Sequence, residues 1–364
     1  MNILVIGLGS MGKRRIRLLK NSFDIHSIVG VDMQEVRREF SEAEYNIKTY
    51  PSIDEAVYNS QFTIHNSQLG TQLNVSLDRA FHNGFDAAFV CTAPLTHFEI
   101  INQCLDNNLN VFSEINLVSD GYDILIKKAK ENNLKLFLSS TPLYRGEIRY
   151  ISKRVKENHQ PLNYIYHVGQ YLPDWHPWES YKDFFIGDSR TNGCREIFAI
   201  ELPWIADAFG EIESIHSVKS KNTGLDIDYP DNYMVTLTHK SGHKGVVCFD
   251  VVSRKAVRRF EVFGETLHIF WNGTPETLSE FDIERSIKKK INTYENVEQN
   301  RDYSESIIEN MYIDEVADFI DYVNGKSVPL YSFEKDVLLL NIIDQIERGS
   351  PPVDFVDIPL EEGD

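Results

Sequence analysis

The chain opens with Met1-Asn2-Ile3-Leu4-Val5-Ile6-Gly7-Leu8-Gly9-Ser10-Met11-Gly12. Residues 2–6 are apolar, as in a short buried strand, and three glycines follow in the spacing Gly-x-Gly-x-x-Gly. In a strand–turn–helix unit, Gly7 allows the tight turn, Gly9 lets the backbone approach a pyrophosphate, and Gly12 permits close packing of helix on strand. The N–H groups of the helix start then face the phosphates. The loop residues expected at this dinucleotide site are Gly7, Gly9, Ser10, Met11 and Gly12.

An acidic residue follows the second expected strand. Asp32 lies 20 residues beyond Gly12, where a carboxylate can accept hydrogen bonds from the adenosine ribose hydroxyls and repel a 2′-phosphate. We therefore expect NAD as the cofactor, although Arg37 and Arg38 nearby keep NADP open. The alternative is that Asp32 caps the helix that follows it.

Length and composition bound the class of protein. With 364 residues and 42.0 kDa, the chain predicts two domains. Its 37 basic and 55 acidic residues give a net charge of −18, which argues against binding nucleic acid or an anionic membrane surface. No apolar run is long enough to span a membrane, and the opening residues do not resemble a signal peptide. Four cysteines without a Cys-x-x-Cys pair indicate a reduced, cytoplasmic protein without a metal cage.

The first 140 residues alternate between strand-like and helix-like segments. Strands are expected at 2–6, 25–31, 87–91, 111–113 and 135–138, and helices at 14–19, 35–44, 97–107 and 124–132. Such βα units predict a parallel Rossmann sheet covered on both faces. Residues 61–74 are rich in Gln, Asn and Thr, and we interpret them as an inserted surface loop.

Beyond Thr141-Pro142 the pattern changes. Longer strands are expected at 162–171, 233–238, 244–252 and 260–271, with a hairpin turn at Gly242 and closing helices at 305–324 and 333–347. Strands with few intervening helices predict a mostly antiparallel open sheet. The fold expected is therefore α/β plus α+β: a Rossmann NAD-binding domain at 1–140 and an α+β substrate-binding and oligomerisation domain at 141–364.

Several motifs resemble the glucose–fructose oxidoreductase / inositol dehydrogenase / MocA family. The stretch from Val90 to His97 is similar to the family's strand-end Thr-Pro-x-x-x-His element, and Val111 to Asn116 occupies the place of its Glu-Lys-Pro motif. Residues 143–145 resemble its aromatic-Arg element, and residues 193–210 resemble its catalytic helix. The resemblance implies hydride transfer with a sugar-like substrate and subunits that pack through the second sheet. It implies that the cofactor is contacted by Thr92, Pro94, His97 and Glu114.

The chain departs from this family at the catalytic positions. Ile115 stands where the family has the lysine that handles the charge of the reacting oxygen, and an isoleucine side chain cannot exchange a proton. Ile197 and Ile200 align with the family's acidic residue and histidine. The chain therefore keeps the cofactor half of the site and lacks the usual acid–base set.

Two segments offer replacement groups. In the first, His176 lies among Trp175, Trp178 and Tyr181, which suits a sugar face and proton transfer. The alternative is an aromatic structural loop with a hydrogen-bonded histidine.

In the second segment, Arg195 could bind a carboxylate or phosphate of the substrate, and Glu196 could orient the arginine. The alternative is an exposed helix start where the helix dipole favours Glu196. The resemblance also implies that Tyr144 and Arg145 line the cleft, and a structural hydrogen-bonding role is their alternative.

Together these observations predict an NAD(H)-dependent oxidoreductase that acts on a sugar, for instance a nucleotide-linked or acidic one. His176, Tyr144 and Glu196 are the candidate catalytic residues. Arg145, Arg195, Trp175 and Trp178 are the candidate substrate contacts. The rival hypotheses are an NAD-binding pseudo-enzyme with a regulatory or assembly role, and an epimerase or lyase with tightly held NAD. We also expect a homodimer or homotetramer built through the second sheet.

Overall fold

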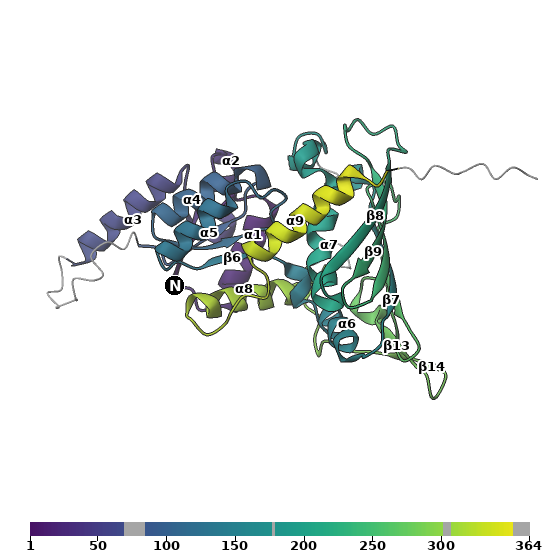
Figure 1. Ribbon diagram of the computed structural model, residues 1–364. Helices are drawn as coiled ribbons and strands as arrows, with labels where there is room; N and C mark the ends of the chain where they lie inside the picture. Colours follow the sequence, from purple (N-terminus) through teal and green to yellow (C-terminus); the bar gives the residue numbers. More distant parts are fainter. Residues whose placement is uncertain (69–83, 177–178, 301–306, 352–364) are drawn as a thin grey trace, which may run out of the picture.

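The computed structural model describes residues 1–68, 84–176, 179–300 and 307–351 of the chain. It contains two sheets side by side, with two late helices returning toward the first one (Figure 1). This confirms the expected combination of a Rossmann sheet with a mostly antiparallel sheet.

The first sheet has six parallel strands in the order β3-β2-β1-β4-β5-β6. Its central strands β1, β4 and β5 are buried on both faces apart from Asn2 and Asn110, because the residues in the middle of these strands are apolar. The strand order reverses between β1 and β4, which is where an open α/β sheet binds its ligand. The strands are β1 (Asn2–Ile6), β2 (Ser27–Val31), β3 (Lys48–Tyr50), β4 (Ala87–Val90), β5 (Asn110–Ser113) and β6 (Leu136–Leu138).

Five helices connect these strands. They are α1 (Ser10–Ser22), α2 (Glu35–Tyr45), α3 (Ile53–Gln68), α4 (His97–Asp106) and α5 (Tyr122–Glu131). We expected residues 61–74 to form a loop. This was wrong for residues 61–68, which continue α3, and residues 69–74 lie outside the described residues. A helix that has begun propagates through Gln, Asn and Thr because each further residue adds one backbone hydrogen bond.

The second sheet has eight strands in the order β14-β13-β12-β11-β7-β10-β9-β8. Neighbours are antiparallel except β7 and β10, which run parallel. Helices α6 (Gly146–Glu157) and α7 (Gly193–Phe209) cover one face. The strands are β7 (Asn163–Gly169), β8 (Ile212–Ser220), β9 (Asn232–His239), β10 (Lys244–Asp250), β11 (Val257–Phe263), β12 (His268–Trp271), β13 (Ser279–Asp282) and β14 (Ile287–Lys290).

Strand burial alternates, since one face packs on the helices and the other is open. Gly242 forms the expected hairpin turn between β9 and β10 with φ of +87°. The single strand expected at 260–271 was wrong. Residues 264–267 form a turn between β11 and β12, closed by the Gly264 N–H donating to the Leu267 carbonyl at 2.9 Å.

Two helices from the end of the chain return to the first sheet, and the second of them also contacts the second sheet (Figure 1). Helix α8 (Asn310–Val323) packs on the sheet through the fully buried Phe319, whose ring lies 5.2 to 5.6 Å from those of Phe89, Phe112 and Phe137. Helix α9 (Phe333–Arg348) begins against α5 and ends at β8. The described residues contain no helix that is both long and apolar enough to cross a membrane.

The contact between α8 and the first sheet can be tested by removing its central ring. We expect Phe319→Ala to lower the free energy of unfolding by about 3–5 kcal/mol, because it leaves a cavity among three aromatic rings. Chemical denaturation followed by circular dichroism measures this. Leu338→Ala on α9, where the side chain is 65% exposed, is the control and should change stability by less than about 0.5 kcal/mol. A Phe319 effect as small as the control would show that α8 does not rest on this sheet.

Candidate functional site

The three glycines of the loop have two different roles. Gly7 and Gly12 are required by close packing, whereas Gly9 leaves space above the backbone. A Cβ on Gly7 would lie 2.7 Å from the Cys91 carbonyl oxygen, and one on Gly12 would lie 1.9 Å from the Gly7 carbonyl oxygen. Gly7 also has φ of +89°, which side chains rarely adopt. A Cβ on Gly9 would meet only the Arg37 Nη1, at 3.9 Å. The loop therefore holds an open cradle above Gly9, at the start of α1, that suits a pyrophosphate.

Asp32 stands beside this cradle at the carboxyl end of β2. Its Oδ2 accepts a hydrogen bond from the Leu8 N–H at 2.8 Å, and its Oδ1 accepts one from the Gln34 N–H at 2.8 Å. Each carboxylate oxygen keeps a second lone pair for a ribose hydroxyl. Arg37 reaches the same carboxylate, with Nη1 3.5 Å from Oδ2. The residues present thus fit the ribose and pyrophosphate of a dinucleotide, while Asp32 also orders the start of α2.

The ends of β4 and β5 are joined through His97. This buried ring, at the start of α4, bonds the Thr92 carbonyl through Nε2 at 2.9 Å and the Asn116 side chain through Nδ1. Burial lowers the pKa of His97, so the ring is neutral near pH 7. Pro94, in the turn that precedes α4, is buried as well. His97, which was predicted to contact the cofactor, therefore joins the loop after β4 to the loop after β5.

Glu114 is engaged within the protein. Its Oε1 accepts a hydrogen bond from Arg15 Nε at 2.6 Å, and Arg15 Nη2 pairs with Glu315 Oε2 at 2.7 Å. Glu315 in turn accepts bonds from the loop after β6, including the Ser140 N–H at 2.8 Å. Sequence reasoning missed this network, which links α1, the end of β5 and α8.

The first turn of α7 lies against the loop that follows β5. Arg195 donates from Nε to the Leu117 carbonyl at 2.6 Å, and its other nitrogens pair with Asp344 and Glu347 of α9. The guanidinium predicted to bind substrate is thus occupied by carboxylates of the chain itself. It is a tie between the two domains, and it fixes the position of its neighbour Glu196.

Glu196 is the candidate that the structure leaves available. Its side chain is half-buried on the first turn of α7, and burial raises the pKa of Glu196 to about 7. Ile200, one turn later, is half-buried as well. A carboxyl group with this pKa can hold or release a proton near neutral pH.

The aromatic loop packs on the same turn. The Trp175 ring lies against Gly193, the first residue of α7, and its Nε1 donates to the Gln170 carbonyl at 3.0 Å. His176 pairs with Glu179, with 2.7 Å between Nδ1 and Oε1, and stacks on Phe184 with ring centroids 4.5 Å apart.

The two segments proposed as replacements therefore meet at the start of α7. Trp178 lies outside the described residues.

Tyr144 and Arg145 point into the protein. The Tyr144 hydroxyl, on a side chain only 2% exposed, donates to Asp318 Oδ2 at 2.6 Å. Burial raises the pKa of this hydroxyl far above its usual range. Arg145 pairs with Glu147 and donates to the Gly273 carbonyl at 2.7 Å. These contacts correspond to the structural alternative, so we assign neither residue to the site.

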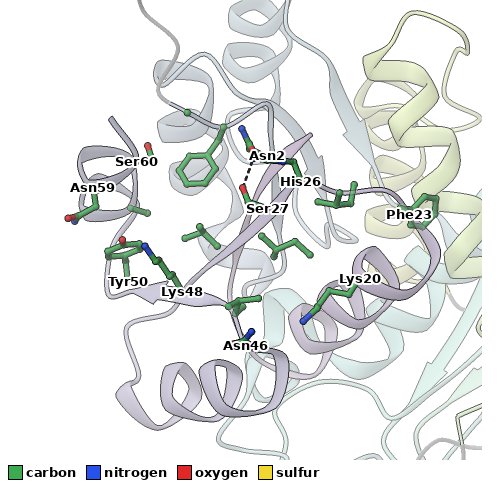
Figure 2. A pocket seen from close by; sticks show the side chains of 17 residues that line it. Asn2, Lys20, Phe23, His26, Ser27, Asn46, Lys48, Tyr50, Asn59 and Ser60 are labelled. Atoms are coloured by element: carbon green, nitrogen blue, oxygen red, sulfur yellow. Dashed lines mark hydrogen bonds between the residues drawn. The ribbon is translucent and has the colours of Figure 1, made fainter. Parts of the chain in front are cut away.

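A cavity lies elsewhere in the first domain. It has a volume of about 610 Å³ and is lined by residues at the amino ends of β1 and β2, among them Asn2, His26 and Ser27 (Figure 2). Ligands of parallel sheets bind at the carboxyl ends of the strands. This cavity is therefore separate from the glycine loop and from Glu196.

The geometry now agrees with a comparison of the sequence with known families. Residues 1–139 match the family model described as an oxidoreductase family with an NAD-binding Rossmann fold. The first 139 residues are thus similar to the GFO_IDH_MocA family. The resemblance seen in the motifs is confirmed, and so is NAD as the cofactor of this family.

Solved structures extend the likeness in fold to both domains. The WlbA dehydrogenase from Bordetella pertussis, solved with NADH and UDP-GlcNAcA, matches with a TM-score of 0.72 at 14% identity, covering 97% of this chain and 99% of that one.

UDP-N-acetylglucosamine 3-dehydrogenase GnnA from Acidithiobacillus ferrooxidans matches with a TM-score of 0.69 at 14% identity, covering 96% of this chain and 97% of that one. An oxidoreductase from Agrobacterium radiobacter, solved with NAD+, L-tartaric acid and magnesium, matches with a TM-score of 0.72 at 11% identity, covering 94% of each chain. A search of curated proteins finds no match.

The role of Asp32 predicts how the protein chooses its cofactor. Asp32→Ala should weaken NAD binding about 10- to 100-fold through loss of a charged acceptor, and should narrow the gap between NAD and NADP. Fluorescence titration with both cofactors measures this. Glu35→Gln removes an equal charge from an exposed site and should change neither affinity. Gly9→Val should abolish binding of both cofactors without unfolding the protein, and unchanged titrations would place the cofactor elsewhere.

Proposed function

We propose that this protein is an NAD-dependent oxidoreductase of the GFO_IDH_MocA family, that it acts on a hydroxyl group of a sugar, and that Glu196 exchanges the hydroxyl proton. The observation that carries the proposal is a half-buried carboxyl group, with a pKa raised by burial to about 7, on the α7 turn that contacts the loop after β5. Ligands of Rossmann sheets lie at these carboxyl ends.

The proton and the hydride have separate destinations in this reaction. Bound NAD+ supplies the hydride acceptor. The ionised Glu196 takes the hydroxyl proton as the carbon–oxygen double bond forms, and it returns a proton to the oxygen in the reverse direction. Ile115 cannot take this part, because its side chain carries no titratable group.

Arg195 supports Glu196 from the adjacent position. Its bonds to Leu117, Asp344 and Glu347 fix the first α7 turn between the two domains. It is a positioning residue. Trp175 packs on the same turn and offers an aromatic surface of the kind that sugar rings stack on.

The nature of the sugar is inferred from the solved relatives. WlbA was solved with UDP-GlcNAcA, and GnnA is a UDP-N-acetylglucosamine 3-dehydrogenase. Both match nearly the whole chain, so we propose a nucleotide-linked amino sugar or its acidic derivative as the substrate class. NAD binding without turnover, as in a pseudo-enzyme, is the rival that the experiments below separate.

We further propose that the protein forms a homodimer or homotetramer through the open face of the second sheet. Four large apolar side chains on adjacent strands are 45–60% exposed there: Ile165, Val218, Met234 and Val246. They form two cross-strand pairs, Val246–Ile165 and Met234–Val218, in rows that lie two residues apart along β9 and β10. Exposed apolar side chains gathered on a wide sheet favour association.

The role of Glu196 is tested by its pH dependence. Glu196→Gln should lower single-turnover hydride transfer by about 10²–10⁴-fold, the usual contribution of a positioned acid–base group. In the wild type, sugar oxidation should rise as the pH passes through about 7, because the ionised carboxylate is the base, and this rise should vanish in the variant. The measurement is NADH absorbance with UDP-linked amino sugars.

Two further variants make this result specific. His176→Ala should retain most of the activity, because its ring already pairs with Glu179. NAD titration of each variant should give unchanged affinity. Full activity in Glu196→Gln with loss in His176→Ala would transfer the role to His176. A wild type that binds NAD and oxidises none of these sugars would favour the pseudo-enzyme.

The assembly is tested by placing a charge on the open face. Met234→Glu should shift the wild-type oligomer to monomers at micromolar concentration, because a carboxylate in an apolar contact must lose its hydration. Light scattering measures the mass. Val328→Glu, at a position 81% exposed outside the sheet, is the control and should leave the mass unchanged. A monomeric wild type would refute the proposal.

A further inference from the structure

Three side chains of metal-binding types meet on the open face of the second sheet, away from the glycine loop and Glu196. They are His167 on β7 and Cys248 and Asp250 on β10, and one donor atom of each lies within 4.8 Å of the others. Cys248 is the register partner of His167, and Asp250 is the partner of Gly169. Parallel pairing of β7 with β10 thus places a thiol, an imidazole and a carboxylate together.

Gly169 makes room for this arrangement. A Cβ at Gly169 would lie 2.4 Å from Asp250 Oδ2, so any other residue would displace the carboxylate. Asp250, only 3% exposed, instead turns across Gly169 toward β7, where its Oδ2 lies 2.7 Å from His167 Nε2. The absence of a side chain at this position therefore brings the carboxylate to the imidazole.

Backbone and hydroxyl groups hold the carboxylate in place. The N–H groups of Val252 and Ser253 donate to Asp250 Oδ1 at 2.9 and 2.7 Å, and the Ser253 hydroxyl donates to Oδ2 at 3.0 Å. Metal-binding carboxylates are oriented by hydrogen bonds of this kind.

The charges of the group suit a divalent cation. A bound cation would displace the proton of the Cys248 thiol, and one thiolate with the Asp250 carboxylate would balance its charge of +2.

The neighbouring strands complete the surroundings. Met234 on β9 is the register partner of Cys248, and Arg259 on β11 is the partner of His167. Arg259 is exposed, so water screens its charge. The remaining side of the group faces the open surface of the sheet, so in the proposed oligomer the group would lie beside the subunit contact at Met234.

A purely structural account explains only part of this group. The hydrogen bond between His167 and Asp250 could serve only to join the ends of β7 and β10. It gives no reason for a half-buried thiol at the register position beside the ring. Cysteine, histidine and aspartate together are a ligand set for zinc, whereas calcium and magnesium prefer oxygen alone.

We propose that His167, Cys248 and Asp250 bind one zinc ion, with water in the fourth position. The thiolate, a ring nitrogen and a carboxylate oxygen would be the protein ligands, and Ser253 would orient the carboxylate. The site does not depend on the proposed oxidoreductase activity, and it is separate from the cofactor.

Zinc and cobalt binding to the full chain tests the proposal without a substrate. Purified protein stripped with a chelator should take up one equivalent of zinc in a competition titration with a chromophoric chelator. Cobalt in its place should give the thiolate-to-metal absorption band of a tetrahedral site. Cys248→Ser should abolish that band and the stoichiometric zinc, and Ser253→Ala should weaken zinc about 10- to 100-fold, as loss of a supporting hydrogen bond does.

Control variants separate this site from general metal binding. His216→Ala removes an exposed histidine of β8 and should bind zinc as the wild type does. Met234→Leu should also bind normally, because the thioether is not among the proposed ligands. Thermal unfolding without metal checks that Cys248→Ser is folded. The proposal is overturned if the wild type binds no zinc, or if folded Cys248→Ser binds it equally well.

Discussion

The guanidinium of Arg15 is fully buried, and its charge is balanced by two carboxylates from distant parts of the chain. Glu114 follows β5, and Glu315 belongs to α8, 300 residues beyond Arg15. Burial opposes the charge on Arg15, yet the two carboxylates raise its pKa above the usual value. Removing one partner of such a group leaves an uncompensated charge and costs about 3–5 kcal/mol. The cofactor helix, the end of β5 and α8 are therefore held as one unit.

A second buried arginine, Arg195, likewise links distant segments of the chain, here between the two domains. Arg195 joins the start of α7 to the loop after β5 and to the end of α9. The proposed acid–base group, Glu196, is its neighbour in sequence. Three separate segments thus meet at Arg195, which holds the turn that carries the proposed acid–base group against the loop after β5.

The sequence was sufficient to predict where the glycine loop and Asp32 lie in the fold, because both belong to one local strand–turn–helix pattern with fixed spacing. It was also sufficient for the two-sheet architecture, because strand and helix periodicities differ. It misled on Arg195, which has the chemistry of an anion-binding residue but finds its carboxylates on α9, about 150 residues later. Nothing local in the sequence distinguishes an arginine that meets a distant carboxylate from one that meets a ligand. Arg15 was missed for the same reason, since an arginine in a helix with other basic residues resembles a solvated one.

The return of α8 also has a consequence during synthesis. Phe89, Phe112 and Phe137 are made early, but Phe319, which covers them, is made about 200 residues later. At ribosomal rates of about 5–20 residues per second, this interval lasts roughly 10–40 s. Throughout it, the nascent Rossmann sheet lacks the ring that covers these three phenylalanines, and exposed apolar surface of this kind favours aggregation.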